Sequence, residues 1–177
     1  AIKKIYNNIK IPALKYQSKT GIYLDKFKKF IKKEQPKIIE VHNRPNYLID
    51  IHKNFPGINY ILIVHNDPLH LKGSVTVQDR VALLEICSQI YFVSRWVEEK
   101  FFTGIEKNFY TNFKIVYPSI NLLKKFPKKE KLIIFSGKLN ISKGFPTFGE
   151  AIIKILNKYN DWSAIVIGDE PREKYNF

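Results

Sequence analysis

The chain has 177 residues, enough for one domain of ordinary size or for parts of two. Its hydrophobic fraction of 45% and aromatic fraction of 14% exclude a disordered chain, because such a composition can bury a core. The formal net charge of +14, from 30 Lys+Arg against 16 Asp+Glu, suits nucleic acid, an anionic membrane or a phosphorylated substrate, and it equally fits lysines spread over a solvated surface.

Short apolar runs alternate with helical patterns from the N-terminus onward. Before the first run, Tyr23, Phe27, Phe30 and Ile31 repeat at helical spacing. A second helical stripe, Val77, Val81 and Leu84, follows the second run. The sequence predicts strands at 37–41, 60–64, 89–93, 114–117, 132–136 and 163–167, with further helices at 95–102 and 147–159. Because the runs are continuous, we expect an α/β fold of Rossmann-like parallel sheets, with strands buried on both faces.

The alternation of predicted strands and helices is interrupted at residues 118–130, where two prolines and several lysines separate two strand-rich stretches. This composition is typical of a linker between domains.

Polar residues or glycine follow most of the predicted strands. In open parallel sheets, ligands bind beyond the carboxyl ends of the strands, so these residues are the first site candidates. They are His42, Asn43, Arg44, His65, Asn66, Asp67, Ser94, Gly137, Lys138 and Gly168.

Among these candidates, His65 can hydrogen-bond a sugar hydroxyl or stabilise a charged intermediate. It can equally have a structural role, with its ring bonded to a backbone carbonyl. His42 has the same two interpretations, while we expect His52 and His70 at the surface. A metal site from His42, His65 and Asp67 lacks the dense spacing of a ligand motif, so we expect no metal.

Two arginines and the single cysteine also have side chains that could be functional. The planar forks of Arg44 and Arg80 can bind phosphate or form structural ion pairs. The single Cys87 lies in an apolar stretch, which predicts a buried thiol and a reducing compartment.

The segment from Leu132 to Gly144 carries the sharpest signal. A buried strand ends at Gly137, where we expect a tight backbone turn, and Lys138 and Lys143 flank the start of a helix. Two ammonium groups beside a helix N-terminus can bind a diphosphate, and they equally fit solvated surface lysines, which are common throughout this chain.

Three segments resemble the family-four retaining glycosyltransferases, which have a GT-B fold of two Rossmann-like domains. They are His65-Asn66-Asp67-Pro68, the segment from Val93 to Val97 that leads to Phe101 and Phe102, and the segment from Phe135 to Gly144. The resemblance implies that 1–117 is the C-terminal portion of the acceptor-side domain, 118–130 a linker, and 131–177 the start of the donor-side domain.

The same resemblance implies transfer of a sugar from a nucleotide-sugar donor to a glycan or lipid-linked acceptor, with retention, without metal or cofactor, in cell-surface polysaccharide biosynthesis. The implied catalytic residues are His65, Lys138 and Lys143. The resemblance assigns binding of the donor diphosphate to Gly137, Lys138, Lys143 and Gly144. It assigns the lining of the acceptor-side cleft to His42, Asn43, Arg44, Asn66, Asp67 and Ser94.

The sequence also departs from the family pattern. Lys138 stands where the family usually has Arg, and the glutamate pair that grips the donor has no counterpart before Phe177. We therefore expect both chain ends to be cuts and the 177 residues alone to be inactive.

We expect a cytoplasmic protein. Its basic charge also allows peripheral contact with the anionic inner face of the membrane. The competing functions are a non-catalytic scaffold and a basic nucleic-acid-binding module. The second lacks a recognisable RNA- or DNA-binding motif, so we expect no nucleic-acid partner.

Overall fold

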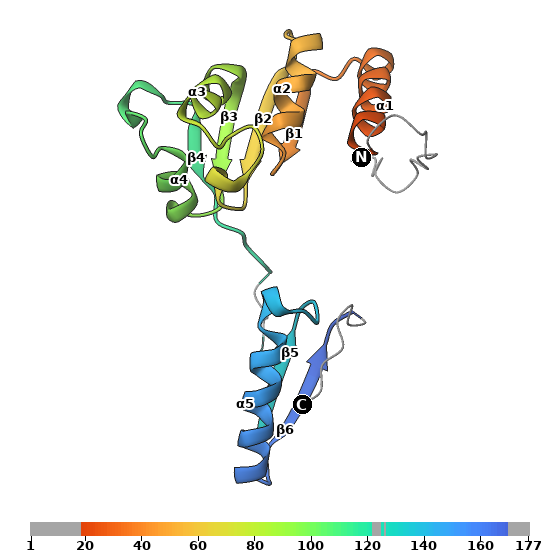
Figure 1. Ribbon diagram of the computed structural model, residues 1–177, viewed down its shortest axis with the longest axis vertical. Coiled ribbons are helices and arrows are strands. Elements are labelled where there is room, and N and C mark those ends of the chain that lie inside the picture. Colours follow the sequence, from red (N-terminus) through yellow and green to blue (C-terminus); the bar gives the residue numbers. More distant parts are fainter. Residues whose placement is uncertain (1–18, 122–124, 126, 170–177) are drawn as a thin grey trace. The chain divides into compact units, whose positions relative to one another are not determined.

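The computed structural model describes residues 19–121, 125 and 127–169 (Figure 1). The chain divides into two compact units: unit 1 ends at Ile120 and unit 2 begins at Asn121. The boundary falls inside the segment 118–130. The assignment of these units to an acceptor-side and a donor-side domain stays a prediction.

Unit 1 contains a parallel sheet with the strand order β1-β2-β3-β4. Its elements are α1 (Lys19–Glu34), β1 (Ile38–His42), α2 (Pro45–Asn54), β2 (Asn59–Val64), the 3₁₀ helix η2 (Pro68–His70), α3 (Val77–Ile86), β3 (Cys87–Phe92), α4 (Arg95–Phe101), the 3₁₀ helix η3 (Lys107–Phe109) and β4 (Phe113–Ile115). The predicted α/β class with parallel strands is confirmed, and each unit 1 strand lies within two residues of its expected bounds.

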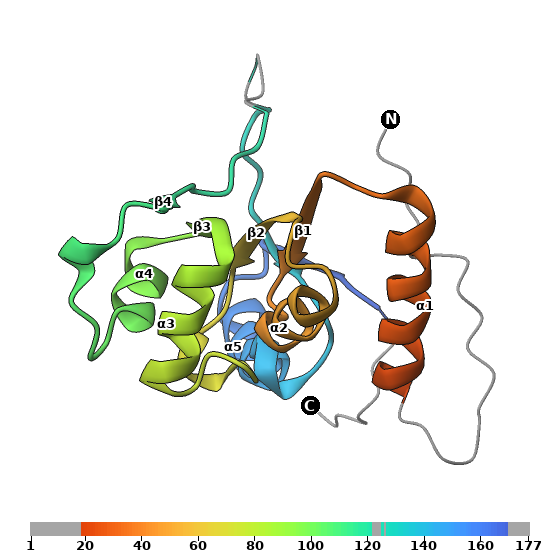
Figure 2. The ribbon, with the colours of Figure 1, turned by 90° about the horizontal axis from the view of Figure 1, so that it is seen from above.

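The crossover helices α2, α3 and α4 lie along one side of this sheet (Figure 2). Right-handed crossovers that all step in one direction produce this arrangement. Alternate residues such as Val41, Leu62 and Ile90 point into the core on that side. The opposite face carries Glu40 and His42, whose side chains are about half exposed. The expectation of strands buried on both faces is therefore wrong for β1, which alternates between buried and exposed residues.

Helix α3 buries a different stripe from the one its apolar residues predicted. Thr76 and Asp79 form a reciprocal capping box at its start. The helix then buries Arg80 together with Leu83 and Leu84, while Val77 is exposed. A charged residue was not expected on the buried stripe, and its hydrogen bonds explain its place there.

Arg80 is 2% exposed and bonds to four backbone carbonyls. Its Nε donates to Phe101 O at 2.6 Å, Nη1 to Ser74 O at 3.1 Å and Val75 O at 2.8 Å, and Nη2 to Thr103 O at 2.6 Å. Burial lowers the pKa of the guanidinium. Arg80 thus joins the loop before α3 to the end of α4. Its guanidinium is engaged by backbone carbonyls and is not free to bind a phosphate.

Unit 2 contains the parallel strands β5 (Leu132–Ser136) and β6 (Ser163–Ile167), joined through the 3₁₀ helix η4 (Ile141–Lys143) and α5 (Phe145–Lys158). Both strands have the predicted bounds. Phe135 packs against Phe145 and Phe148 of α5, with ring centroids 5.3 and 5.1 Å apart. Across the described residues of both units, no helix is long and apolar enough to cross a membrane.

Candidate functional site

The carboxyl ends of β1 and β2 bring two histidines together. The parallel register pairs His42 with Ile63, so the residue that follows β2, His65, lies beside His42. The Nδ1 atom of His42 and the Nε2 atom of His65 are 2.9 Å apart. Two residues 23 positions apart in the chain therefore form a direct hydrogen bond.

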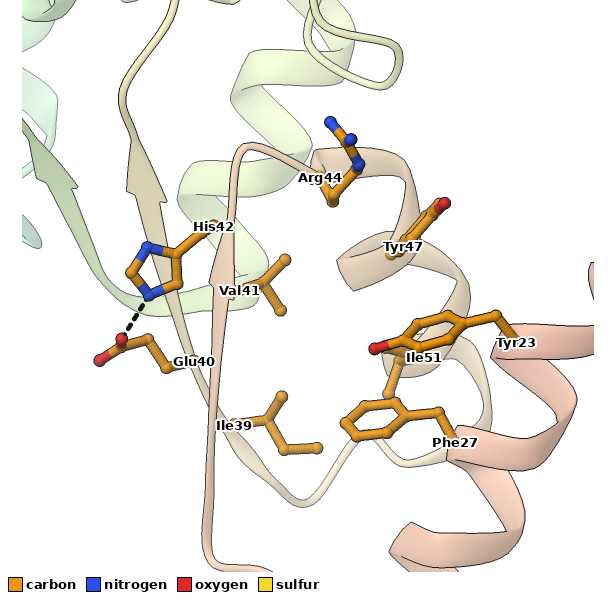
Figure 3. Close-up of a pocket in the computed structure, with 9 residues that line it drawn as sticks. All are labelled: Tyr23, Phe27, Ile39, Glu40, Val41, His42, Arg44, Tyr47 and Ile51. Atoms are coloured by element: carbon orange, nitrogen blue, oxygen red, sulfur yellow. Dashed lines mark hydrogen bonds and ion pairs between the residues drawn. The ribbon is translucent and has the colours of Figure 1, made fainter. Parts of the chain in front are cut away.

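Glu40 extends this pair into a row of three side chains. Its Oε1 atom lies 2.6 Å from Nε2 of His42, on the same side of β1 (Figure 3). The two imidazole rings are inclined by 19° with centroids 5.2 Å apart, while their facing nitrogens are much closer. The rings therefore meet edge to edge and nearly coplanar, which is the geometry that an N–H···N hydrogen bond requires.

Asn43 holds the loop on which His65 lies. Its backbone φ of 50° is in the left-handed region, which asparagine tolerates better than most residues. Its Oδ1 atom accepts from the backbone N–H groups of His65, at 2.7 Å, and Asn66, at 3.2 Å. The side-chain oxygen predicted to line an acceptor cleft is thus engaged within the protein.

The pKa of His65 is lowered, first by partial desolvation of its otherwise exposed ring and then by the neighbouring His42. Both causes disfavour the imidazolium form. His65 is thereby held neutral over a wider range of pH, in the form that can accept a proton.

Two other predicted cleft residues cap helices. Asp67 accepts from Leu69 N at 3.0 Å and lies 3.0 Å from Nδ1 of His70, and the Leu69 bond is the first cause of its lowered pKa. Ser94 Oγ accepts from Val97 N at the start of α4. These contacts are local, and they explain both residues without a ligand.

The remaining histidine, His52, departs from the surface position expected for it. It is partly buried and lies edge-on to the ring of Tyr60, with centroids 5.5 Å apart. Within the described ranges, no group of three or more His, Cys, Asp or Glu side chains is arranged to hold a metal ion.

Two hollows adjoin the end of β1, and Arg44 and Tyr47 line both. One, of about 490 Å³, is mainly apolar and lies between α1, β1 and α2 (Figure 3). Figure 3 places its aromatic rings on the opposite side of β1 from His42 and Glu40. The other, of about 480 Å³, is polar and cationic. Its lining residues are Thr20, Asn43, Arg44, Asn46, Tyr47, His70, Leu71 and Lys72.

In unit 2, the predicted diphosphate residues lie on the turn between β5 and α5. Asn140 caps η4 by accepting from Lys143 N at 3.1 Å. Gly144 then adopts a left-handed φ of 73°, a conformation that glycine takes without steric cost. Lys138 and Lys143 are exposed, and neither ammonium has a partner among the residues described.

The glycine at the end of β5 differs from its expected role. Gly137 does not have a positive φ, and a Cβ built on it would meet nothing closer than 3.8 Å. Its backbone therefore does not require glycine. Gly168, at the end of β6, is the tighter position: a Cβ there would lie 2.3 Å from Gly137 O. In the sequence Gly168 is only a strand-end residue, and no local pattern indicates this close approach.

The N-terminus of α5 offers fewer free donors than a simple helix start. Pro146 has no N–H, and Phe145 N donates to Asn140 O at 3.3 Å. Within this first turn, Thr147 has the N–H that no described bond uses. Attraction for an anion here must come mainly from the lysines.

No protein-family model matches the chain, and no curated protein matches it in sequence. Solved structures do match. The co-structure of S. aureus MnaA with UDP aligns with a TM-score of 0.56 and 11% identity, over 92% of this chain and 48% of the other. A UDP-N-acetylglucosamine 2-epimerase from Rickettsia bellii aligns with a TM-score of 0.48 and 13% identity, over 87% and 45%.

The chain thus spans about half the length of the solved structures it matches. At this level of identity, the likeness to the MnaA structure establishes a common fold: parallel-strand α/β units of the kind found in Rossmann-like GT-B half domains.

Proposed function

We propose that this chain is part of a nucleotide-sugar enzyme, and that its reaction is transfer of a sugar to a glycan or lipid-linked acceptor with retention of configuration. The observation that carries the proposal is the segment 137–144, where two exposed lysines without described partners flank a capped turn that follows β5. The likeness to a protein solved with UDP supports a nucleoside diphosphate as the ligand.

In this proposal, Lys138 and Lys143 neutralise the donor diphosphate. Negative charge grows on the diphosphate as the sugar leaves, so fixed cations stabilise the transition state more than the ground state. The space at Gly137 lets the phosphate approach the backbone, because no side chain occupies it. Gly137 is thus proposed to serve phosphate binding, since its backbone conformation alone does not require a glycine.

Unit 1 supplies the residues that act on the acceptor. His65 is the proposed catalytic histidine, and the polar hollow with Arg44, His70 and Lys72 suits an acceptor that carries a phosphate. A cytoplasmic enzyme of surface polysaccharide assembly, in peripheral contact with an anionic membrane, would meet such acceptors. The basic composition of the chain is compatible with that setting.

Calorimetric titration with UDP tests the donor site directly. Charge-assisted contacts to phosphate are worth about 1.5–3 kcal/mol, so Lys138→Ala or Lys143→Ala should weaken UDP binding about 10- to 100-fold. Lys154→Ala, an exposed lysine of α5, is the matched control and should leave affinity unchanged. Uridine, which lacks the diphosphate, should bind weakly to all variants alike.

UDP affinity that both alanine variants retain, with normal circular dichroism, rejects the diphosphate assignment. For the reaction itself, NMR of a UDP-sugar incubated with the intact protein separates transfer to an added acceptor from hydrolysis or epimerisation of the donor. A changed sugar without transfer rejects the transferase and keeps the nucleotide-sugar enzyme.

A further inference from the structure

The contacts of the two histidines at the ends of β1 and β2 determine where their protons lie. Glu40, when ionised, only accepts hydrogen bonds, so the Nε2 atom of His42, 2.6 Å away, must carry a proton. A neutral imidazole carries one proton, and Nδ1 of His42 is then a lone pair. The Nε2 atom of His65, 2.9 Å from that lone pair, must therefore be the donor.

The same accounting leaves Nδ1 of His65 as a lone pair. No described residue hydrogen-bonds to this atom, and the His65 side chain is exposed. The other three nitrogens of the pair are already engaged in the row. A proton arriving from a substrate therefore has one place to bind, Nδ1 of His65.

We propose that Glu40, His42 and His65 form a proton relay, in which Nδ1 of His65 accepts the proton of a substrate hydroxyl and Glu40 and His42 act as positioning residues. This inference rests on the proposed function for the identity of the hydroxyl, which is that of the sugar acceptor. His42 keeps the accepting nitrogen of His65 free, and Glu40 keeps His42 in the tautomer that does so.

The O–H bond of the acceptor breaks and its proton moves to Nδ1 of His65. The hydroxyl oxygen bonds to the anomeric carbon on the face from which the diphosphate departs, which retains the configuration, while the bond from that carbon to the donor phosphate breaks and its electron pair leaves with the diphosphate. The proton between the rings can then move from Nε2 of His65 to Nδ1 of His42. The positive charge comes to lie on His42, in contact with the Glu40 carboxylate.

The surrounding charges are consistent with this path. Asp67, two residues after His65, is engaged by Leu69 N and His70, and it also lies in the field of Lys100 of α4. The Arg44 guanidinium donates to Asn43 O in the loop after β1. Glu40 is thus the described carboxylate that contacts the histidine pair. The lowered pKa of His65 keeps it neutral and able to accept a proton near neutral pH.

Nitrogen-15 NMR of the 177-residue chain with labelled histidine tests the relay without a substrate. Above its titration midpoint, His65 should be the tautomer protonated at Nε2. In Glu40→Gln, the amide can donate to His42 Nε2, which a carboxylate cannot, so both rings can reverse. His65 should then become a mixture of tautomers, and its midpoint should fall by about half a pH unit because a nearby negative charge is lost.

His42→Phe should act in the opposite direction on the midpoint. It removes the neighbouring imidazole that lowers the pKa of His65, so the midpoint rises, and it removes the acceptor, so His65 again becomes a mixture of tautomers. Glu34→Gln, an exposed carboxylate at the end of α1, is the matched control and should change neither property. Circular dichroism checks that each variant is folded.

Two results would overturn the relay: a wild-type His65 protonated at Nδ1, or a tautomer and midpoint that neither variant changes. These results are independent of the donor site. If UDP binding fails while the tautomers are as expected, the relay holds and the proposed reaction is rejected. If UDP binding depends on Lys138 while His65 is protonated at Nδ1, the donor site holds and the relay is rejected.

Discussion

Asn43 offers the most direct test of how the fold positions His65. Replacing it with Ala removes the oxygen that accepts from the backbone N–H groups of His65 and Asn66. It also forces an alanine into the left-handed region at φ 50°. Asn43→Asp retains an oxygen acceptor, and aspartate tolerates that conformation.

The magnitude follows from these two losses. Each hydrogen bond contributes about 0.5–1.5 kcal/mol, and the lower half of that range applies because both are exposed. The left-handed conformation costs alanine about 1–2 kcal/mol. We therefore expect Asn43→Ala to lower the free energy of unfolding by about 2–4 kcal/mol, which is a fall in Tm of roughly 10 °C or more for a unit of about 100 residues.

Thermal and urea unfolding followed by circular dichroism measure this loss. Asn43→Asp should stay within about 1 kcal/mol of the wild type, and Asn108→Ala, at an exposed asparagine of η3, should change little. An Asn43→Ala protein as stable as the wild type, or an Asp variant as damaged as the Ala variant, would refute the reasoning.

Four other predictions follow from particular contacts. Arg80→Met should lower the free energy of unfolding by about 3 kcal/mol or more, because it leaves buried carbonyls without a donor, whereas exposed Arg44→Met should cost little; equal melting temperatures for the two variants would contradict this. Gly168→Ala should destabilise unit 2, since its Cβ would lie 2.3 Å from Gly137 O, while Gly137→Ala should fold normally and weaken UDP binding; chemical unfolding and calorimetry separate the two effects. Burial raises the pKa of Cys87 to about 12, so its thiol should resist a thiol reagent at pH 8 in the folded protein and react once the chain is unfolded in urea. The pKa of Asp67 is lowered in the folded state, so its carboxylate contributes stability above its unfolded pKa that is lost as the pH falls through the folded pKa; Asp67→Asn should flatten this part of the acid unfolding curve.

The sequence by itself determined the α/β class and most of the strand positions. Runs such as 132–136 and 163–167 are short, apolar and bounded by turn residues, so local composition is enough to identify them. Helix α2 was not predicted, although Pro45 at its first turn is a recognised start signal.

Tertiary structure decided what the candidate residues do. The register of β1 against β2 places His42 and His65 in contact, and no local pattern encodes a pairing across 23 residues. Arg80 could be a phosphate ligand or a structural residue until the loop before α3 and the end of α4 bring their carbonyls around it. Asn43 lines the polar hollow beside β1, and the fold also brings its oxygen within hydrogen-bonding distance of the backbone of His65. A side chain's local chemistry limits what it can bind, but its partners depend on which distant backbone groups the fold brings within hydrogen-bonding distance.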